Sequence, residues 1–221
     1  MMAFSKMVPV MTDTEMATRI VEASQLLVCN SMNHGATGNI SIRHKKGFFI
    51  TPSGIAPSKM TPDLICRMDM AGECEKGMRP SSEWRIHRDI YLARPEVNAI
   101  IHTHSTFATT LACMQLNVPP FHYMIAVTGG NTIPCAPYAL FGSQELSDAV
   151  LGTLGKGYAC LMAHHGMVAV GNSLDHALSI AIEVESLCEQ YWRILQIGHP
   201  VLLSEEQMHE VHGKFRDYFK K

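Results

Sequence analysis

Two histidines stand one residue apart in the apolar segment "VNAIIHTHST", residues 97–106. In an extended strand alternate side chains share a face, so His102 and His104 are predicted to point one way and Thr103 the other. Two neutral imidazoles on one face are suited to chelating a divalent metal ion. The alternative is a pair of half-buried histidines that hydrogen-bond to backbone groups, and this segment alone does not decide between the two.

A metal site needs further ligands, and few side chains can supply them. The segment "MAHHGM", residues 162–167, places His164 and His165 in a second apolar run. Adjacent residues of a strand face opposite ways, so at most one of them can join the site. Glu83 follows two serines at the start of a predicted helix. Its local interpretation is a first-turn acid that stabilises the helix dipole.

The surrounding pattern predicts helices on both sides of a central sheet. Apolar spacing and capping residues predict helices over 12–30, 81–94, 143–155, 173–198 and 204–221. Short apolar runs bounded by Gly, Pro and Ser predict strands over 38–43, 47–54, 98–105, 121–130 and 132–139, and a strand pair over 158–171. Residues 97–144 contain no Asp, Glu, Lys or Arg, which indicates a buried centre. We expect a single domain over residues 1–221, an α/β fold with α/β/α layers around a mixed or antiparallel sheet.

Composition narrows the class of protein. The formal net charge of -2 leaves no basic footprint for nucleic acid or an anionic membrane. No apolar run approaches the length of a transmembrane helix. Seven cysteines without a C-x-x-C pair, and an N-terminus unlike a signal peptide, predict a reduced protein in the cytoplasm.

Several segments occur in the order and spacing of the class II aldolase/adducin superfamily: "GATGNISIR", "TPSGIAPSKM", "PSSEWRIHRDIY", "AIIHTHS", "FHYMIAVTGGNTIPCAPYALFGSQEL" and "AHHGMVAVG". The chain resembles this family over nearly its whole length, and most closely its fuculose-phosphate aldolase branch. The resemblance implies a mainly antiparallel sheet of nine strands between helices, and a homotetramer with active sites at subunit boundaries. It also implies a metal-dependent aldolase of carbohydrate metabolism.

The same resemblance implies a set of metal ligands. His102, His104 and His165 would hold Zn²⁺, or Mn²⁺ or Co²⁺ in its place, with Glu83 as the fourth ligand. This chooses His165 over His164 and replaces the local interpretation of Glu83. The family pattern also makes Glu83 the general base.

Two tyrosines and a phosphate site complete the implied active site. Tyr123 would exchange a proton with the aldehyde oxygen, which suits a hydroxyl that is neutral at pH 7, and Tyr218 would come from the C-terminal tail. Phe141 would lie at the aldehyde end. The phosphate set would be Thr37, Asn39, Ser53, Gly54, Ser81 and Ser82. Locally these residues are turns and caps. Hydroxyls, amides and backbone N–H groups can nevertheless hold phosphate without arginine.

The implied reaction cleaves a deoxy-ketose 1-phosphate of the fuculose-1-phosphate type into dihydroxyacetone phosphate (DHAP) and a small aldehyde. Retro-aldol cleavage leaves charge on an enediolate, which either a lysine Schiff base or a divalent metal can stabilise. The lysines all lie outside the charge-free segment, which favours the metal.

Several alternatives remain open. The substrate could be 5-deoxyribulose or methylthioribulose 1-phosphate. A sugar-phosphate epimerase like L-ribulose-5-phosphate 4-epimerase would carry Asp at position 83. A non-catalytic adducin-like module would lose metal ligands, yet all four are present.

Overall fold

The structure, a computed structural model, describes residues 11–218. The first ten residues, on which the absence of a signal peptide partly rests, lie outside this range. The last three residues of the helix predicted over 204–221 lie outside it as well.

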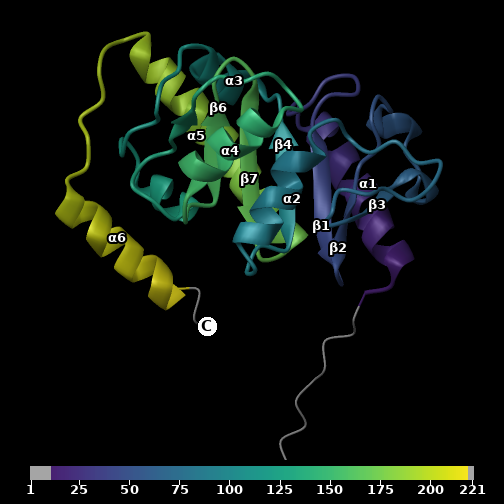
Figure 1. The fold of residues 1–221 in the computed structure, drawn as a ribbon. Coiled ribbons are helices and arrows are strands. Elements are labelled where there is room, and N and C mark those ends of the chain that lie inside the picture. The colour runs from purple at the N-terminus through teal and green to yellow at the C-terminus, as the bar shows by residue number, and fades with distance from the viewer. Residues whose placement is uncertain (1–10, 219–221) are drawn as a thin grey trace, which may run out of the picture.

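A seven-stranded sheet forms the centre of the described chain, with strand order β3-β2-β1-β4-β7-β6-β5 (Figure 1). The strands are β1 (Asn39–His44), β2 (Gly47–Ile50), β3 (Cys66–Asp69), β4 (Ala99–Thr103), β5 (Cys135–Ala136), β6 (Ala159–Met162) and β7 (Gly166–Gly171). All neighbours pair antiparallel except β5 and β6, which are parallel. The mainly antiparallel sheet is therefore confirmed. Residues 11–218 form seven strands where the family pattern implied nine.

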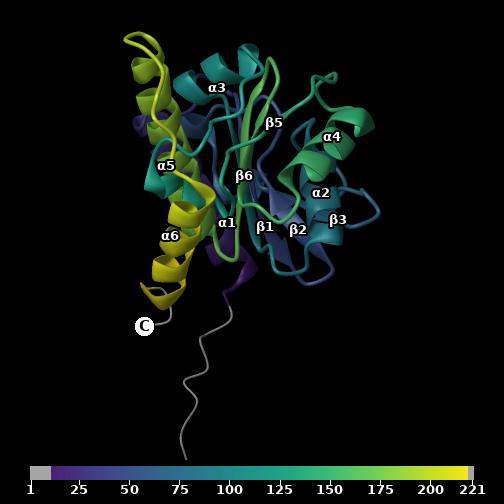
Figure 2. The same cartoon turned by 90° about the vertical axis from the view of Figure 1, so that its left-hand side faces the viewer.

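Helices cover both faces of this sheet, as predicted, and Figure 2 shows the layers edge-on. On one face lie α1 (Asp13–Cys29), α3 (Thr106–Cys113) and α5 (Leu174–Leu195), and on the other lie α2 (Trp84–Ala93) and α4 (Gln144–Leu154). The last helix, α6 (Glu205–Tyr218), lies on the α5 side and contacts the 3₁₀ helix η3 (Tyr123–Thr128). Short 3₁₀ helices η1 (Pro57–Lys59) and η2 (Pro62–Leu64) connect β2 to β3.

The alternation of side chains along β4 shows how the sheet divides the core. Ile101 packs with the α1, α3 and α5 layer, whereas Ile100 packs with α2 and α4. His102 and Ile100 are two residues apart, so His102 points to the α2 side. Every residue of β4 is buried. A strand buried on both faces has no place for a charged side chain, which accounts for the uncharged sequence around it.

Two predicted strands are wrong or much shorter than expected. The segment predicted as a strand over 121–130 contains η3 (Tyr123–Thr128) instead, and this helix ends at Gly129, whose φ is 80°. His122 caps this helix by accepting a hydrogen bond from the backbone N–H of Met124. The strand predicted over 132–139 is reduced to β5, because Pro134 and Pro137 flank it and cannot donate ladder hydrogen bonds.

Besides the short 3₁₀ helices η1 and η2, one α-helix and one strand were not predicted. Helix α3 follows His104 and contains several β-branched threonines, which give a weak helical signal. Its N-terminus is capped by a side chain far away in the sequence, Glu185. Strand β3 carries Arg67 and Asp69 on its exposed face and is only four residues long.

None of the helices formed by residues 11–218 is both long enough and apolar enough to cross a lipid bilayer.

Candidate metal centre and active site

Three segments converge at one end of the central strands. His102 lies in β4, His104 follows directly after that strand, and His165 lies in the turn between β6 and β7. Strands β4 and β7 pair in register, with His102 opposite Val168, so the turn before β7 lies beside the end of β4. Glu83 is the N-cap residue of α2, the helix that covers this face.

The three imidazoles form a nearly equilateral triangle. The ring of His102 is 4.8 Å from that of His104 and 4.9 Å from that of His165, and His104 and His165 are also 4.9 Å apart. The Nε2 atoms of His102 and His104 approach to 2.9 Å. With a carboxylate oxygen of Glu83, the four potential ligand atoms all lie within 4.8 Å of one another. The predicted pairing of His102 and His104 on one side of the strand is therefore present.

The Glu83 carboxylate bridges two of these rings. Its Oε2 lies 3.1 Å from Nε2 of His102, and its Oε1 lies 3.1 Å from Nε2 of His165. Asn39 donates a hydrogen bond from Nδ2 to Oε2 at 3.0 Å. Oε1 is buried and has no well-aligned hydrogen bond.

The turn that carries His165 depends on its neighbours. A Cβ on Gly166 would lie 2.3 Å from the carbonyl oxygen of Thr103, so only glycine lets this turn approach the end of β4. His164 adopts φ 57° and is exposed. This left-handed backbone places His165, and not His164, in the cluster with Glu83, His102 and His104.

The electrostatics of the site depend on the contact between Glu83 and its histidines. Burial alone would raise the pKa of the Glu83 carboxyl, but the bonds and charges of His102 and His165 hold that pKa well below its usual range. Burial lowers the pKa of His102, yet Glu83 and the Met167 carbonyl outweigh it and raise that pKa. Burial and the two neighbouring histidines lower the pKa of His104 to about 4.

These residues fit a divalent cation. The Nδ1–H of His102 donates to the Met167 carbonyl at 2.8 Å, which directs Nε2 toward the cluster. Oε1 of Glu83 is a buried oxygen that lacks an aligned donor and points at the same place. Three imidazole nitrogens and one carboxylate oxygen are the donor set that zinc accepts in catalytic sites.

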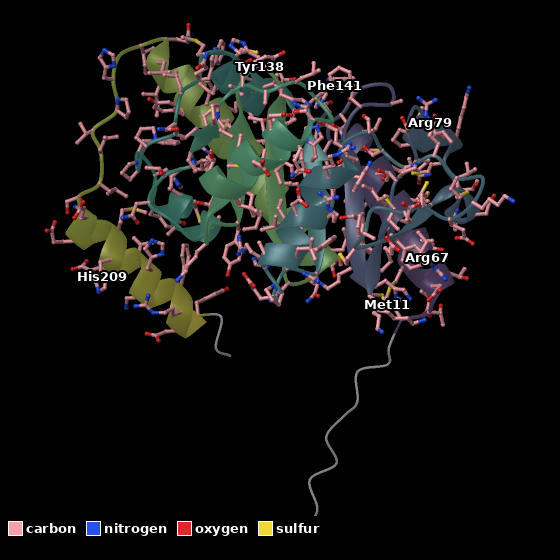
Figure 3. The ribbon with its side chains drawn as sticks, viewed as in Figure 1. Met11, Arg67, Arg79, Tyr138, Phe141 and His209 are labelled. Atoms are coloured by element: carbon pink, nitrogen blue, oxygen red, sulfur yellow. The ribbon has the colours of Figure 1, made fainter. Side chains whose placement is uncertain are left out.

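A cavity of about 380 Å³ opens directly above the cluster. Glu83, His104 and His165 form its inner wall, and the whole predicted phosphate set lines it. That set comprises Thr37, Asn39, Ser53, Gly54, Ser81 and Ser82. Phe141 and Tyr138 belong to the exposed rim, and Figure 3 labels both at the upper edge of the view, away from α6.

The two predicted tyrosines are not among the residues that line this cavity. Tyr123 begins η3, stacks on His122 and is half exposed. Tyr218 ends α6 and is largely exposed. Helix α6 lies far from the rim residues Tyr138 and Phe141 (Figure 3).

Sequence reasoning missed a group of buried polar residues behind the site. Asn39 is bonded to His87, which is bonded to Ser41, which is bonded to Tyr91. The signal was present, because Glu83, His87 and Tyr91 follow one another at intervals of four along a helix. Asn39 and Ser41 are two apart on one strand.

Sequence reasoning also missed Asn33, which holds the backbone of His104. Asn33 accepts a hydrogen bond from the backbone N–H of His104 at 3.0 Å. A Cβ on Gly38, whose φ is 74°, would lie 2.3 Å from the Asn33 side chain. Gly38, the second glycine of "GATGN", therefore leaves room for the Asn33 side chain, which holds the backbone of His104.

The fold and this cluster define a class of enzyme. The family model described as Class II Aldolase and Adducin N-terminal domain matches residues 18–192, and the chain belongs to this family. Class II aldolases are metal-dependent lyases.

Individual relatives cover almost the whole chain. The chain is 45% identical over 199 residues to a 5-methylthioribulose-1-phosphate/5-deoxyribulose-1-phosphate aldolase of Rhodospirillum rubrum, covering 90% of each. It is 41% identical over 209 residues to the L-fuculose phosphate aldolase of Escherichia coli strain K12, covering 94% of this chain and 97% of that one. A solved structure of an L-fuculose 1-phosphate aldolase superposes with a TM-score of 0.89 at 35% identity, covering 93% of this chain and 98% of the other.

Proposed function

We propose that the protein reversibly cleaves a deoxy-ketose 1-phosphate into DHAP and a small aldehyde, with a zinc ion held by His102, His104, His165 and Glu83. One observation carries this proposal: three imidazoles converge, and two of them, His104 and His165, line a cavity that also presents small hydroxyl and amide groups. When bound, the zinc ion supplies Lewis-acid stabilisation of the negative charge that develops as the carbon–carbon bond breaks.

The cavity lining supports recognition of a phosphate. Ser53, Ser81 and Ser82 offer hydroxyl donors, and Gly54 has an open backbone with φ 73°. No lysine is among the lining residues within 11–218, so the charge of the reaction is not assigned to a Schiff base. If these serines and Gly54 bind a doubly charged phosphate, the aldehyde half of the substrate lies toward the rim of the cavity.

Glu83 and Tyr123 are assigned the proton transfers. In the synthesis direction the Glu83 carboxylate removes a proton from the DHAP carbon, and the Tyr123 hydroxyl donates a proton to the aldehyde oxygen. In the cleavage direction both protons return. The long side chain of Glu83 suits a residue that both contacts the histidines and reaches the substrate carbon.

The assignment of Tyr123 requires a second subunit. Tyr123 and Tyr218 do not line the cavity of their own chain, and large apolar side chains surround its mouth. Tyr138, Leu140 and Phe141 are each more than half exposed. These observations support a homotetramer in which Tyr123 of the partner subunit completes the site.

Two features support further parts of this proposal. All seven described strands belong to one sheet, which supports a single domain over residues 1–221. The seven cysteines are all unpaired, which supports a reducing compartment, the cytoplasm.

A 5-substituted pentulose phosphate is a second candidate substrate. The rim is apolar, with Tyr138, Ala139 and Phe141, and suits a methylthio or methyl group. The Rhodospirillum relative, named for such substrates, has the higher identity of the two relatives described, 45% against 41%.

The experiment is a coupled assay of DHAP release from fuculose, 5-deoxyribulose and methylthioribulose 1-phosphates, and from ribulose 5-phosphate as the epimerase control. We expect zinc-dependent DHAP release from at least one ketose 1-phosphate and loss of release with EDTA. Activity in protein shown by metal analysis to carry no ion would overturn the metal mechanism. Epimerised ribulose 5-phosphate without DHAP release would replace the aldolase with an epimerase.

Two further variants test the assigned roles. Glu83→Gln is expected to abolish exchange of the DHAP carbon proton with solvent while the protein stays folded. Mixing inactive Glu83→Gln and Tyr123→Phe proteins is expected to restore activity, because some sites of a mixed tetramer then combine Glu83 and Tyr123. No recovery after subunit exchange would assign both residues to the same chain or remove Tyr123.

A further inference from the structure

A continuous hydrogen-bond chain runs behind the Glu83 carboxylate, from α2 to β1 and back. Asn39 Nδ2 lies 3.0 Å from Glu83 Oε2, and Asn39 Oδ1 lies 2.5 Å from His87 Nε2. His87 Nδ1 lies 2.6 Å from Ser41 Oγ, which lies 2.7 Å from the Tyr91 hydroxyl. All five side chains are buried, and His87 and Ser41 are 0% exposed.

The chemistry of these groups fixes which atom donates and which accepts in every hydrogen bond of this series. An ionised carboxylate only accepts hydrogen bonds, so the Asn39 amide must present its NH₂ group to Glu83. The amide oxygen then faces His87 and can only accept, so Nε2 of His87 carries the proton. In a neutral ring Nδ1 is then an acceptor, and it accepts a hydrogen bond from the Ser41 hydroxyl. Ser41 in turn accepts from Tyr91.

The surroundings of His87 favour this neutral form. Burial, followed by the nearby charge of His102, lowers the pKa of His87 to about 3. Burial raises the pKa of the Tyr91 hydroxyl, so this group keeps its proton. His87 and Tyr91 therefore both keep the protonation that the hydrogen-bond direction requires.

We propose that His87 is a positioning residue, which fixes the Asn39 amide with its NH₂ group toward Glu83 and the cavity. Ser41 and Tyr91 fix the tautomer of His87 from behind. The proposal rests on the assignment of Glu83 as a metal ligand and base. It adds His87, Ser41 and Tyr91, which are not among the residues that line the cavity.

The alternative orientation of Asn39 shows why this matters. An amide turned by 180° would place Oδ1 against Glu83 Oε2 and leave its NH₂ group facing the Nε2–H of His87. Both contacts would then be repulsive. Asn39 also lines the cavity, so the same turn would present an oxygen to an incoming phosphate. A His87 ring that donates from Nε2 excludes this orientation of the Asn39 amide. An apolar side chain of similar size at position 87 would not exclude it.

The first test uses the native protein without metal and without substrate. With ¹⁵N-labelled histidine and EDTA present, the ring nitrogens of His87 are expected to show the neutral Nε2–H tautomer between pH 6 and 8. The signal is assigned by its loss in His87→Gln. An Nδ1–H tautomer would reverse the whole hydrogen-bond chain, and an imidazolium would donate to Ser41 instead of accepting from it. Either result would overturn the proposal.

The second test compares His87→Gln with His87→Leu. The glutamine amide nitrogen can reach the position of Nε2 and donate to Asn39, whereas leucine fills the space without a donor. We expect His87→Leu to weaken zinc binding, measured by competition with a chelator, by about 10–100-fold, and His87→Gln to retain most of the affinity. In the aldolase assay the loss in His87→Leu is expected in both kcat and KM.

A matched control separates positioning from general destabilisation. Ser147→Ala removes a part-buried hydrogen bond of 2.7 Å from Ser147 Oγ on α4 to Asp89 Oδ2, which lies on the same helix α2 as His87 but outside the hydrogen-bond chain. We expect its zinc affinity to be that of the native protein. Equal zinc affinities in His87→Leu and His87→Gln would overturn the proposal. Should His87→Leu not fold, the tautomer measurement on the native protein still decides. Neither the tautomer nor the zinc affinity needs turnover, so a failed aldolase assay would overturn only the proposed function.

Discussion

Ser105 Oγ donates a hydrogen bond of 2.7 Å to Oε2 of Glu185, a residue eighty positions later on helix α5. The same carboxylate accepts from the backbone N–H groups of Phe107 and Ala108 at 2.8 and 2.9 Å. Glu185 therefore caps α3 in place of a local N-cap side chain. Because Ser105 directly follows His104, this cap also holds one end of the segment that carries a proposed metal ligand.

Removing this cap is expected to cost stability and zinc affinity together. Glu185→Ala leaves two backbone donors and one hydroxyl without their acceptor, and should lower the free energy of unfolding by about 2 kcal/mol. Urea unfolding measures this change. Glu189→Ala, which removes an exposed pair with Arg193 on the same helix, should cost less than about 1 kcal/mol. Equal losses in the two variants would contradict a capping role for Glu185.

Gly166 is expected to be irreplaceable, in contrast to another glycine of the chain. In Gly166→Ala the new Cβ meets the Thr103 carbonyl oxygen, so the β6–β7 turn must move away from β4 and take His165 with it. We expect loss of zinc binding together with a lower unfolding midpoint. Gly152→Ala in α4 meets no atom within 4 Å and should stabilise the protein by about 1 kcal/mol. Zinc bound with native affinity by Gly166→Ala would refute the argument.

The metal-free protein is expected to lose stability in acid partly through His87. Burial lowers the pKa of His87 to about 3, whereas an unfolded histidine has a pKa of about 6.5. Between these values the unfolded chain binds a proton that the folded chain does not. Stability is therefore fully present above about pH 6.5 and declines as pH falls toward 3.

This contribution can be isolated by comparison with His87→Gln, which has no group to titrate. Between pH 6 and 4 the free energy of unfolding in EDTA should fall more steeply in the native protein, by about 1.4 kcal/mol per pH unit. Parallel slopes would mean that His87 is not a buried neutral residue.

Zinc is expected to stabilise the folded protein through His165 and not through its neighbour His164. At a free zinc concentration of 100 times the dissociation constant, binding to the folded state alone adds about 2.7 kcal/mol. His165→Ala should lose this zinc-dependent rise in melting temperature, and EDTA should reverse it in the native protein. His164→Ala should keep it, because His164 is outside the ligand cluster. Zinc-independent melting of the native protein would argue against the site.

The alternation of side chains along strands allowed much of this site to be predicted. His102 and His104 were expected on one side of a buried strand from their spacing alone, and the three rings do converge. The role of Glu83 was not visible locally, because a glutamate at a helix start has a sufficient explanation in the helix dipole. It became an expectation only through the family resemblance.

The unpredicted parts depend on contacts between residues far apart in the sequence. Helix α3 is stabilised by Glu185, and no local signal in "STFATTLAC" predicts this helix. The segment around Tyr123 has the composition of a strand but lacks a neighbouring strand to pair with, so it closes local turns instead. His87 shares a helical stripe with Glu83 and Tyr91, yet its partner Asn39 lies on another element.

The position of β4 between β1 and β7 has a consequence for synthesis on the ribosome. The hairpin of β1 and β2 can form early and cover one edge of β4. The other edge stays open until residues 166–171 have been translated, and an open apolar edge is prone to pair with another chain. The residue made just before that strand is His165. The last proposed metal ligand is therefore translated just before the strand that pairs with the open edge of β4 and protects it from other chains.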